Sequence, residues 1–200
     1  YRNRIDGSMY KGKEIIDKSD ELQGTYWCID HEEIVRKESI QALQYTDQIL
    51  DVVRGYLGIE PIHVQTASWI SLPNTEVLGK KIASTNAQLF HQDKGFIDFI
   101  KVFLYLNDVN ENNGPHTYCL GSHLDQPIEY GYKISKRFSD EEISEKYSKN
   151  TIVSISGNMG TVIFGDTTCL HKGTVPIKGY RYILQLTYAS SLYMSQVYPW

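Results

Sequence analysis

The sequence predicts a mainly β protein, a barrel or jelly roll braced by helices near its N-terminus. A helical pattern of apolar residues is confined to the first third of the chain. After Pro61, short segments rich in Val, Ile, Thr, Tyr and Phe alternate with turn-forming clusters. Helices followed by many short strands with tight turns are typical of one closed or sandwiched β architecture.

The helical pattern covers residues 40–57. Its apolar positions follow a helical period: Ile40, Leu43, Leu50, Val53 and Leu57. Asp30 followed by Glu33 is a capping-box pattern that predicts a helix start, and Gly55 and Gly58 predict the end. A solvated linker would leave this apolar stripe exposed, so we expect a packed amphipathic helix.

Five segments have the composition of strands: 62–71, 82–91, 96–106, 161–164 and 182–189. Ser139 and Glu142 repeat the capping-box pattern and predict a short helix over 140–149. The polar segment 125–150 is therefore expected to be an insertion between strands and a candidate lid. We expect one domain over 1–200, with a mostly helical part (1–60) and a β core (61–200).

Composition narrows the class of protein. The 200 residues carry 20 Lys and Arg against 24 Asp and Glu, a formal charge of -4, which disfavours nucleic acid and anionic lipid as primary partners. Three widely separated cysteines form no disulfide framework, so a reducing compartment is expected. No segment approaches the roughly 18 apolar residues of a membrane span, and the first residues lack a signal-peptide core. We expect a cytoplasmic protein, although the missing initiator Met leaves a processed or cropped chain open.

The pattern His-x-Asp or His-x-Glu occurs three times, at residues 31–33, 91–93 and 123–125. The first falls in predicted helix, where residues i and i+2 lie about 200° apart and cannot converge on one ion. The third follows Gly-Ser in a predicted turn. Only His91 and Asp93 end a β-like run, in which i and i+2 point to the same side. Two imidazoles and one carboxylate on one face of iron(II) leave positions open for a cosubstrate and oxygen.

His171 is the candidate third ligand, and Arg181 follows it by ten residues at the start of a predicted strand. A guanidinium can clamp the distal carboxylate of a dicarboxylate cosubstrate with two hydrogen bonds. Lys101 and Lys133 also stand ten residues after histidines, so a basic residue at this spacing is not rare here. From the residues alone, Arg181 is either such an anchor or a surface charge at a strand edge.

Five separated segments stand in one order along the chain: FHQD at 90–93, VFLYLNDV at 102–109, NGP at 113–115, LGSH at 120–123 and GTVIFGD at 160–166, followed by His171 and Arg181. Together they resemble the phytanoyl-CoA dioxygenase-like (PhyH) family over about residues 60 to 190. The resemblance implies a double-stranded β-helix, the cupin-type jelly roll. It also implies an iron(II), 2-oxoglutarate-dependent dioxygenase that uses O2.

The resemblance assigns roles to individual residues. It implies that His91, Asp93 and His171 bind iron(II) and that Arg181 anchors 2-oxoglutarate. Related halogenases have a small residue at the position of Asp93, so a carboxylate there favours hydroxylation, or a desaturation or ring closure, over halogenation. The implied products beside the oxidised substrate are succinate and CO2.

Two further cofactor contacts are implied by the resemblance. Several relatives place a Gln three residues before the first ligand to bind the keto-acid end, and Gln88 stands there. Relatives often have Ser or Thr two residues after the last His. This chain has Gly173 there with Thr174 next, which makes Thr174 the candidate for that second anchor.

Other readings of the same residues remain open. A cupin-like barrel could hold zinc or manganese for an isomerase or hydrolase, or be a binding barrel without catalysis. Cys169, two residues before His171, could be a ligand, although a lone Cys is often a small buried apolar residue. We interpret His123 as structural or as a neighbour of the ligands, and His63 and His116 as ordinary polar residues.

The sequence leaves the primary substrate open, because the family acts on acyl-CoA esters, free metabolites, amino-acid derivatives and carrier-tethered intermediates. We expect a small metabolite or an acyl- or carrier-linked substrate. Trp69, Tyr105 and Tyr118 could line its pocket or belong to the core. Three basic residues of the 125–150 segment could meet an anionic substrate or face solvent. The oligomeric state is not indicated.

Overall fold

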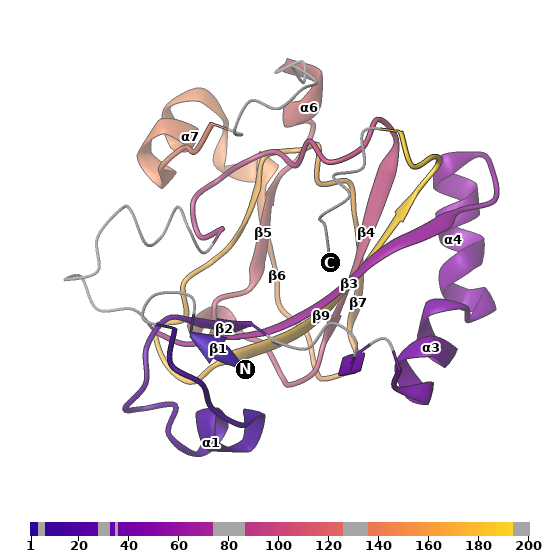
Figure 1. Ribbon diagram of the computed structural model, residues 1–200. Coiled ribbons are helices and arrows are strands. Elements are labelled where there is room, and N and C mark those ends of the chain that lie inside the picture. The colour runs from indigo at the N-terminus through magenta and orange to yellow at the C-terminus, as the bar shows by residue number, and fades with distance from the viewer. Residues whose placement is uncertain (4–6, 28–32, 35, 74–86, 126–135, 194–200) are drawn as a thin grey trace.

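Two antiparallel β-sheets face each other in this computed structural model (Figure 1). The structure describes residues 1–3, 7–27, 33–34, 36–73, 87–125 and 136–193. The larger sheet has the order β1 (Arg2–Asn3), β2 (Thr25–Trp27), β3 (Ile62–Ser71), β9 (Arg181–Ala189), β4 (Phe99–Tyr105) and β7 (Val162–Gly165). The smaller sheet has the order β6 (Ile152–Ile155), β5 (His116–Cys119) and β8 (His171–Gly173). This arrangement confirms the predicted mainly β, jelly-roll fold.

The helices lie at the periphery of the sheets (Figure 1). They are α1 (Gly12–Asp17), α3 (Glu38–Gln44), α4 (Asp47–Leu57), α6 (Ser122–Asp125) and α7 (Asp140–Lys146), with short 3-10 turns at Glu111–Asn113 and Lys149–Thr151. The N-terminal part also contributes β1 and β2 to one edge of the larger sheet, which the sequence pattern did not indicate. No helix in the described part of the chain is both long and apolar enough to cross a bilayer.

The helix predicted over 40–57 is divided into α3 and α4, because Thr46 between them has an extended backbone. Gly58 ends α4 in the left-handed conformation (φ 70°), as expected. The expectation that Gly55 helps to end the helix was wrong, since this residue lies inside α4. The predicted start at Asp30 falls outside the described residues.

Helix α4 packs its apolar stripe on the outer face of the larger sheet. Val53 and its neighbours contact Ile100 and Val102 of β4 and Leu184 of β9. Each such buried side chain contributes about 1.5–3 kcal/mol relative to exposure. The alternate residues of the same strands point inward, where Phe103 belongs to a second buried cluster. The strands therefore have an outer face for the helices and an inner face for the site.

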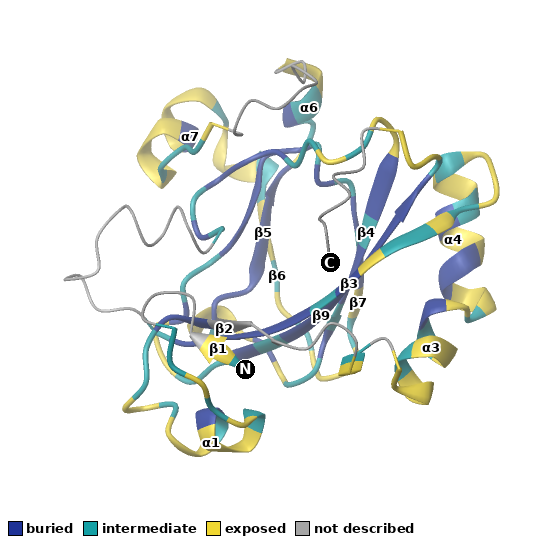
Figure 2. Cartoon of the chain, in the orientation of Figure 1, coloured by how far each residue is buried: buried dark blue, intermediate teal, exposed yellow. Residues whose placement is uncertain are grey.

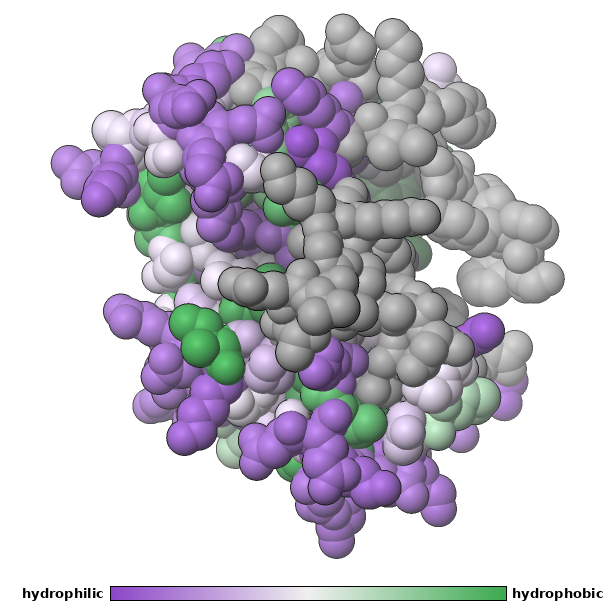
Figure 3. All heavy atoms as spheres, turned by 90° about the vertical axis from the view of Figure 1, so that its left-hand side faces the viewer, coloured by the Kyte–Doolittle hydropathy of each residue, from purple (hydrophilic) through white to green (hydrophobic). Residues whose placement is uncertain are grey.

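The inner space is closed by contacts between the two sheets. The hydroxyl of Tyr105 on β4 donates to the carbonyl of Ile155 on β6 (2.7 Å) and accepts from the backbone N–H of His116 on β5 (3.0 Å). Figure 2 shows that buried residues follow the strands and that exposed residues gather on the helices. On the face that carries α1 and α7, hydrophilic side chains predominate, with hydrophobic ones between them (Figure 3).

The predicted helix after Ser139 is present as α7, and its capping box is confirmed. The backbone N–H of Ser139 donates to Oε2 of Glu142 (2.7 Å), and the N–H of Glu142 donates to Oγ of Ser139 (3.3 Å). Ile143 of α7 packs in one cluster with Phe90 and Leu170, next to the site segments. Residues 126–135 of the candidate lid lie outside the described part. The lid and the single-domain organisation both stay predictions.

Four of the five expected strands are confirmed within a few residues, as β3, β4, β7 and β9. Of the fifth, 82–86 lie outside the described residues, and Phe90 and His91 form isolated bridges to Phe138 and His171. The sequence pattern missed β5, β6 and β8. These strands have three or four residues, too few to show a recognisable alternation.

Candidate metal centre

His91 and His171 are brought together by a pair of backbone hydrogen bonds. The N–H of His91 donates to the carbonyl of His171 (3.0 Å), and the N–H of His171 donates to the carbonyl of His91 (2.9 Å). Residues paired in this way project their side chains to the same side. The two imidazole centroids consequently lie 4.3 Å apart, and both residues are buried.

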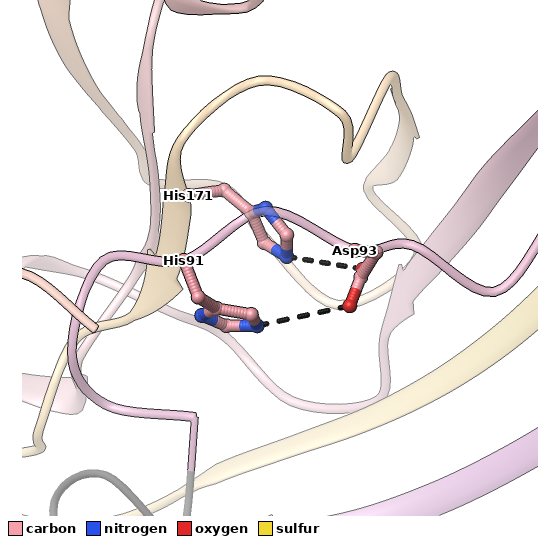
Figure 4. Close-up of side chains that lie close together, drawn as sticks. All are labelled: His91, Asp93 and His171. Carbon is pink, nitrogen blue, oxygen red and sulfur yellow. Dashed lines mark ion pairs between the residues drawn. The ribbon is translucent and has the colours of Figure 1, made fainter. Parts of the chain in front are cut away.

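Asp93 completes the cluster from the same segment as His91. Its backbone N–H donates to the carbonyl of Thr167 (2.8 Å), which fixes the segment beside the loop before His171. One carboxylate oxygen lies 3.3 Å from Nε2 of His171 and the other 3.9 Å from Nε2 of His91 (Figure 4). All three potential ligand atoms lie within 4.8 Å of one another.

The hydrogen bonds of the two rings fix which nitrogen faces the centre. Nδ1 of His91 contacts the carbonyl of Leu89 (2.9 Å), and Nδ1 of His171 contacts the carbonyl of Cys169 (3.0 Å). Since a carbonyl can only accept, each Nδ1 carries a proton, and Nε2 is the ring nitrogen that faces Asp93 and is available to a metal ion. Three electron-rich atoms point into one space, an arrangement that a divalent cation stabilises.

Burial and charge keep this donor set in the form that binds metals. Burial, and then the neighbouring His171, lower the pKa of His91 well below its usual value, so its imidazole is neutral at neutral pH. Burial acts to raise the pKa of Asp93, but Lys101 and His171 outweigh it and hold that pKa well below its usual value. The cluster therefore presents the neutral imidazole of His91 and the carboxylate of Asp93 beside the ring of His171.

Lys101 is a functional candidate that sequence reasoning missed. Its Nζ donates to Oδ2 of Asp93 (2.7 Å), and both side chains are largely buried. In the sequence, the one notable feature of Lys101 is its position ten residues after His91. Lys101 lies on the inner face of β4 because it alternates along the strand with Phe103 and Tyr105. The same alternation could have predicted this position if the inner face had been identified from the sequence.

Arg181 is buried at the start of β9, with 2% of its surface exposed. Its guanidinium donates to the carbonyls of Gly114 and Thr174 and to Oγ of Ser71 (3.3 Å). Among the described residues, no carboxylate lies within ion-pair distance of it. Burial lowers the pKa of Arg181 to about 10, which leaves it cationic at neutral pH. The reading of Arg181 as a surface charge was wrong.

The backbone around Arg181 is shaped to receive it. A side chain at Gly173 would collide with the guanidinium of Arg181 in its present position. Gly114 has a positive φ of 75° and lies against the carbonyl of Thr174. Of the two further candidate cofactor contacts, Thr174 lies beside Arg181, and its Oγ1 contacts Oγ1 of Thr117 (2.9 Å). Gln88 is buried in the segment before His91.

The interpretation of His116 as an ordinary polar residue was wrong. His116 is 4% exposed, and its ring lies 4.3 Å from that of Phe103 and 5.8 Å from that of His171. Tyr118, two residues further along β5, stacks 5.7 Å from the His171 ring. Nδ1 of His116 and the hydroxyl of Tyr118 are buried, and neither has a hydrogen-bond partner within the described structure. The sequence pattern did not indicate this burial, because β5 was not recognised as a strand.

Among the described residues, His63 and His123 do not belong to the cluster. Nε2 of His63 contacts Oγ1 of Thr66 (3.0 Å), and its ring packs on Tyr188, which belongs to the cluster under α4. Nδ1 of His123 contacts Sγ of Cys169 (2.9 Å), and among the described residues this sulfur is grouped with His123 and Asp166 and not with the His91, Asp93 and His171 cluster. His31 falls outside the described residues.

A double-stranded β-helix that gathers two histidines and one aspartate at a buried point is the arrangement of mononuclear non-haem metal enzymes. The chain belongs to the phytanoyl-CoA dioxygenase (PhyH) family, whose sequence model matches residues 4–175. This range contains the three clustered residues and ends before Arg181. No curated protein sequence matches the chain.

Solved structures with this fold come from enzymes of low sequence identity. AviO1 from Streptomyces viridochromogenes Tue57 is 12% identical with a TM-score of 0.58, covering 100% of this chain and 74% of that one. HygX from Streptomyces hygroscopicus, with nickel, 2-oxoglutarate and hygromycin B bound, is 14% identical with a TM-score of 0.51, covering 74% and 64%. The epimerase SnoN, in complex with Fe3+, alpha ketoglutarate and nogalamycin RO, is 16% identical with a TM-score of 0.58, covering 82% and 62%. In these two comparisons the chain covers less than two thirds of the SnoN chain and of the HygX chain with hygromycin B bound.

Proposed function

We propose that the protein is an iron(II), 2-oxoglutarate-dependent dioxygenase that hydroxylates a C–H bond of a small molecule and releases succinate and CO2. The observation that carries the proposal is the convergence of His91, Asp93 and His171 at one buried point. Membership of the PhyH family supports it independently of the geometry.

The donor set fits iron(II). Two imidazole nitrogens and one carboxylate are the ligands of the facial triad, which leaves the remaining positions on the metal for cosubstrate and oxygen. His91 and His171 would each bind through Nε2, because their Nδ1 protons are held by backbone carbonyls. Asp93 would bind through a carboxylate that Lys101 orients. The bound iron with 2-oxoglutarate and O2 would supply the oxidation, while the protein positions the reactants.

Arg181 would bind the distal carboxylate of 2-oxoglutarate. A buried guanidinium whose described partners are neutral oxygens retains its full charge, and a carboxylate would satisfy it with bidentate hydrogen bonds. We propose that Gln88 and Thr174 line the same subsite, as the family resemblance implies. Thr174 already contributes its carbonyl to the Arg181 side chain.

The inner wall would keep bulk water away from the reacting groups. Phe103, Tyr105 and Ile183 are buried in one cluster between the two sheets, next to the ring of His116. A dry interior strengthens the charge interactions of the cluster and limits side reactions of an oxidising site. The substrate itself would enter beside the metal. That HygX and SnoN, which share this fold, hold hygromycin B and nogalamycin RO supports a small organic molecule as substrate.

Epimerisation is the second candidate reaction. SnoN shares the fold and is an epimerase with iron and alpha ketoglutarate, so hydroxylation is not the only outcome reached on this framework. The two reactions differ in the product: hydroxylation adds an oxygen atom to the substrate, whereas epimerisation leaves the mass unchanged. Mass spectrometry of the product with 18O2 therefore distinguishes them.

Anaerobic titration of the purified chain with iron(II) and 2-oxoglutarate tests the proposal without knowledge of the substrate. We expect a visible metal-to-ligand charge-transfer band that requires both components and disappears on admission of O2, with formation of succinate. Succinate added in place of 2-oxoglutarate should give no band. Absence of the band with iron and 2-oxoglutarate both in excess would refute the assignment, and catalysis with zinc alone would favour an isomerase or hydrolase.

A further inference from the structure

A second group of metal-binding side chains lies next to the candidate centre. His123 belongs to α6, whereas Asp166 and Cys169 belong to the segment between β7 and β8. Each residue offers one potential ligand atom, and these atoms all lie within 4.8 Å of one another. Nδ1 of His123 is 2.9 Å from Sγ of Cys169. The three donors thus come from two segments far apart in the sequence and meet at one point.

The surroundings of the group restrict how each donor is presented. Cys169 is buried, with 7% of its surface exposed, while His123 and Asp166 are half-buried. One carboxylate oxygen of Asp166 accepts from the N–H (2.9 Å) and the hydroxyl (2.5 Å) of Thr168. Tyr56 of α4 also hydrogen-bonds to this carboxylate. The carboxylate is therefore held in place beside the sulfur and the imidazole before any ion binds.

We propose that His123, Asp166 and Cys169 form a zinc-binding site. A thiolate sulfur, an imidazole nitrogen and a carboxylate oxygen are all ligands that Zn2+ accepts, and a water molecule would complete the tetrahedron. Zinc bonds of about 2.3 Å to sulfur and 2.0–2.1 Å to nitrogen can reach donor atoms that lie within 4.8 Å of one another, once the 2.9 Å hydrogen bond between His123 and Cys169 opens to admit the ion. Zn2+ would bind the sulfur as thiolate, releasing the thiol proton to solvent. This site differs from the His91, Asp93 and His171 cluster in its sulfur donor, which favours zinc over magnesium or calcium.

The position of this site gives the ion a structural role. The loop that contains Asp166 and Cys169 is hydrogen-bonded to the segment that carries His91 and Asp93. The carbonyl of Thr167 accepts from the N–H of Asp93 (2.8 Å), and the carbonyl of Thr168 accepts from the side chain of Gln92 (2.8 Å). The carbonyl of Cys169 itself receives Nδ1–H of His171 (3.0 Å). Zinc would tie this loop to α6 through His123. It would thereby fix the backbone that orients two members of the first cluster.

Cobalt(II) titration of the metal-free full-length chain tests the proposal, because cobalt replaces zinc and reports a thiolate ligand by an intense near-ultraviolet charge-transfer band. We expect this band, its loss on addition of zinc, and a second bound equivalent beyond that of the first cluster. Cys169→Ala should abolish the band and the second equivalent. Cys119→Ala is the matched control, since Cys119 is also a buried thiol but belongs to β5 and lies outside the group.

Asp93→Asn separates this proposal from the proposed function. It should weaken metal binding at the first cluster while the thiolate band stays unchanged. A wild-type chain that binds cobalt without a thiolate band would overturn the zinc site and reduce the group to a hydrogen-bonded thiol and imidazole. The same conclusion would follow if the band persisted in Cys169→Ala. Far-ultraviolet circular dichroism of each variant verifies that the fold is retained.

Discussion

Two regions of the barrel interior carry opposite charge patterns. In the first, His91, Asp93 and His171 direct electron-rich atoms at one point. In the second, the guanidinium of Arg181 is buried among neutral oxygens of the described residues. The first region favours a cation and the second an anion. Because a buried charge is costly without a partner, we infer that this interior is organised for ligands more than for stability.

The two patterns are complementary to one composite ligand. Under the proposed function, a metal ion would satisfy the first region, and a dicarboxylate that reaches from the metal to Arg181 would satisfy the second. The regions are also linked through one strand, since β8 runs from His171 to Gly173, whose backbone lies against the guanidinium. We infer that turnover requires both regions. Because each region would bind a different ligand, substitutions in the first should impair metal binding, and substitutions in the second should impair 2-oxoglutarate binding.

Removing a donor from the first region should have the largest effect. His91→Ala leaves an imidazole and a carboxylate, too few ligands to retain iron(II) in competition with water, so 2-oxoglutarate turnover should be abolished. Succinate formation and the charge-transfer band measure it. His63→Gln is the control, because His63 lies on the outer face of the sheet. Wild-type turnover in His91→Ala would mean that the cluster does not bind the catalytic metal.

Removing the charge from the second region should leave the affinity for iron(II) unchanged and weaken the binding of 2-oxoglutarate. Arg181→Met should raise the KM for 2-oxoglutarate about ten- to a hundredfold, the value of a lost charged hydrogen bond. Iron(II) affinity in the absence of 2-oxoglutarate should change little. Arg181→Lys should recover part of the loss, and Arg54→Met, which alters an exposed ion pair on α4, should have no effect. An equal loss of iron affinity would show that the two regions are not separable.

Lys101→Met removes the partner of the metal-facing carboxylate without removing a ligand. We expect the affinity for iron(II) to fall about tenfold, because Asp93 is then free to rotate. This is the lower end of the loss, about ten- to a hundredfold, that follows when a metal ligand loses the partner that orients it. Lys101→Arg should restore most of the affinity, since a guanidinium can make the same hydrogen bond. Lys178→Met, at an exposed position, is the control. Unchanged affinity in Lys101→Met would show that the carboxylate is positioned without Lys101.

Gly173→Ser tests the close approach between the two regions and should have the smallest effect. The added side chain would meet the guanidinium of Arg181, and such overpacking costs about 1–3 kcal/mol in the free energy of unfolding. Chemical denaturation measures it. Gly55→Ala adds a methyl group where nothing lies within 4 Å and should be neutral or stabilising in α4. A stable Gly173→Ser variant would show that the guanidinium moves freely at this position.

The sequence by itself determined the class of fold and the three clustered residues. Val, Ile, Thr, Tyr and Phe in short runs require a β architecture, and the strand alternation that places His91 and Asp93 on one side is a local property of the backbone. The capping box at Ser139 is local as well, which explains why it was predicted correctly.

Only the tertiary structure decided which side chains surround those residues. Contacts between segments that are distant in sequence produce three features of the site. They are the ion pair between Lys101 and Asp93, the burial of His116 and the close approach of Arg181 to Gly173. Short strands such as β5 are held by their neighbours and carry too few residues for a pattern of their own. Strand alternation and the family resemblance can therefore name the candidate residues of the site from the sequence, while their partners become visible only when both sheets are assembled.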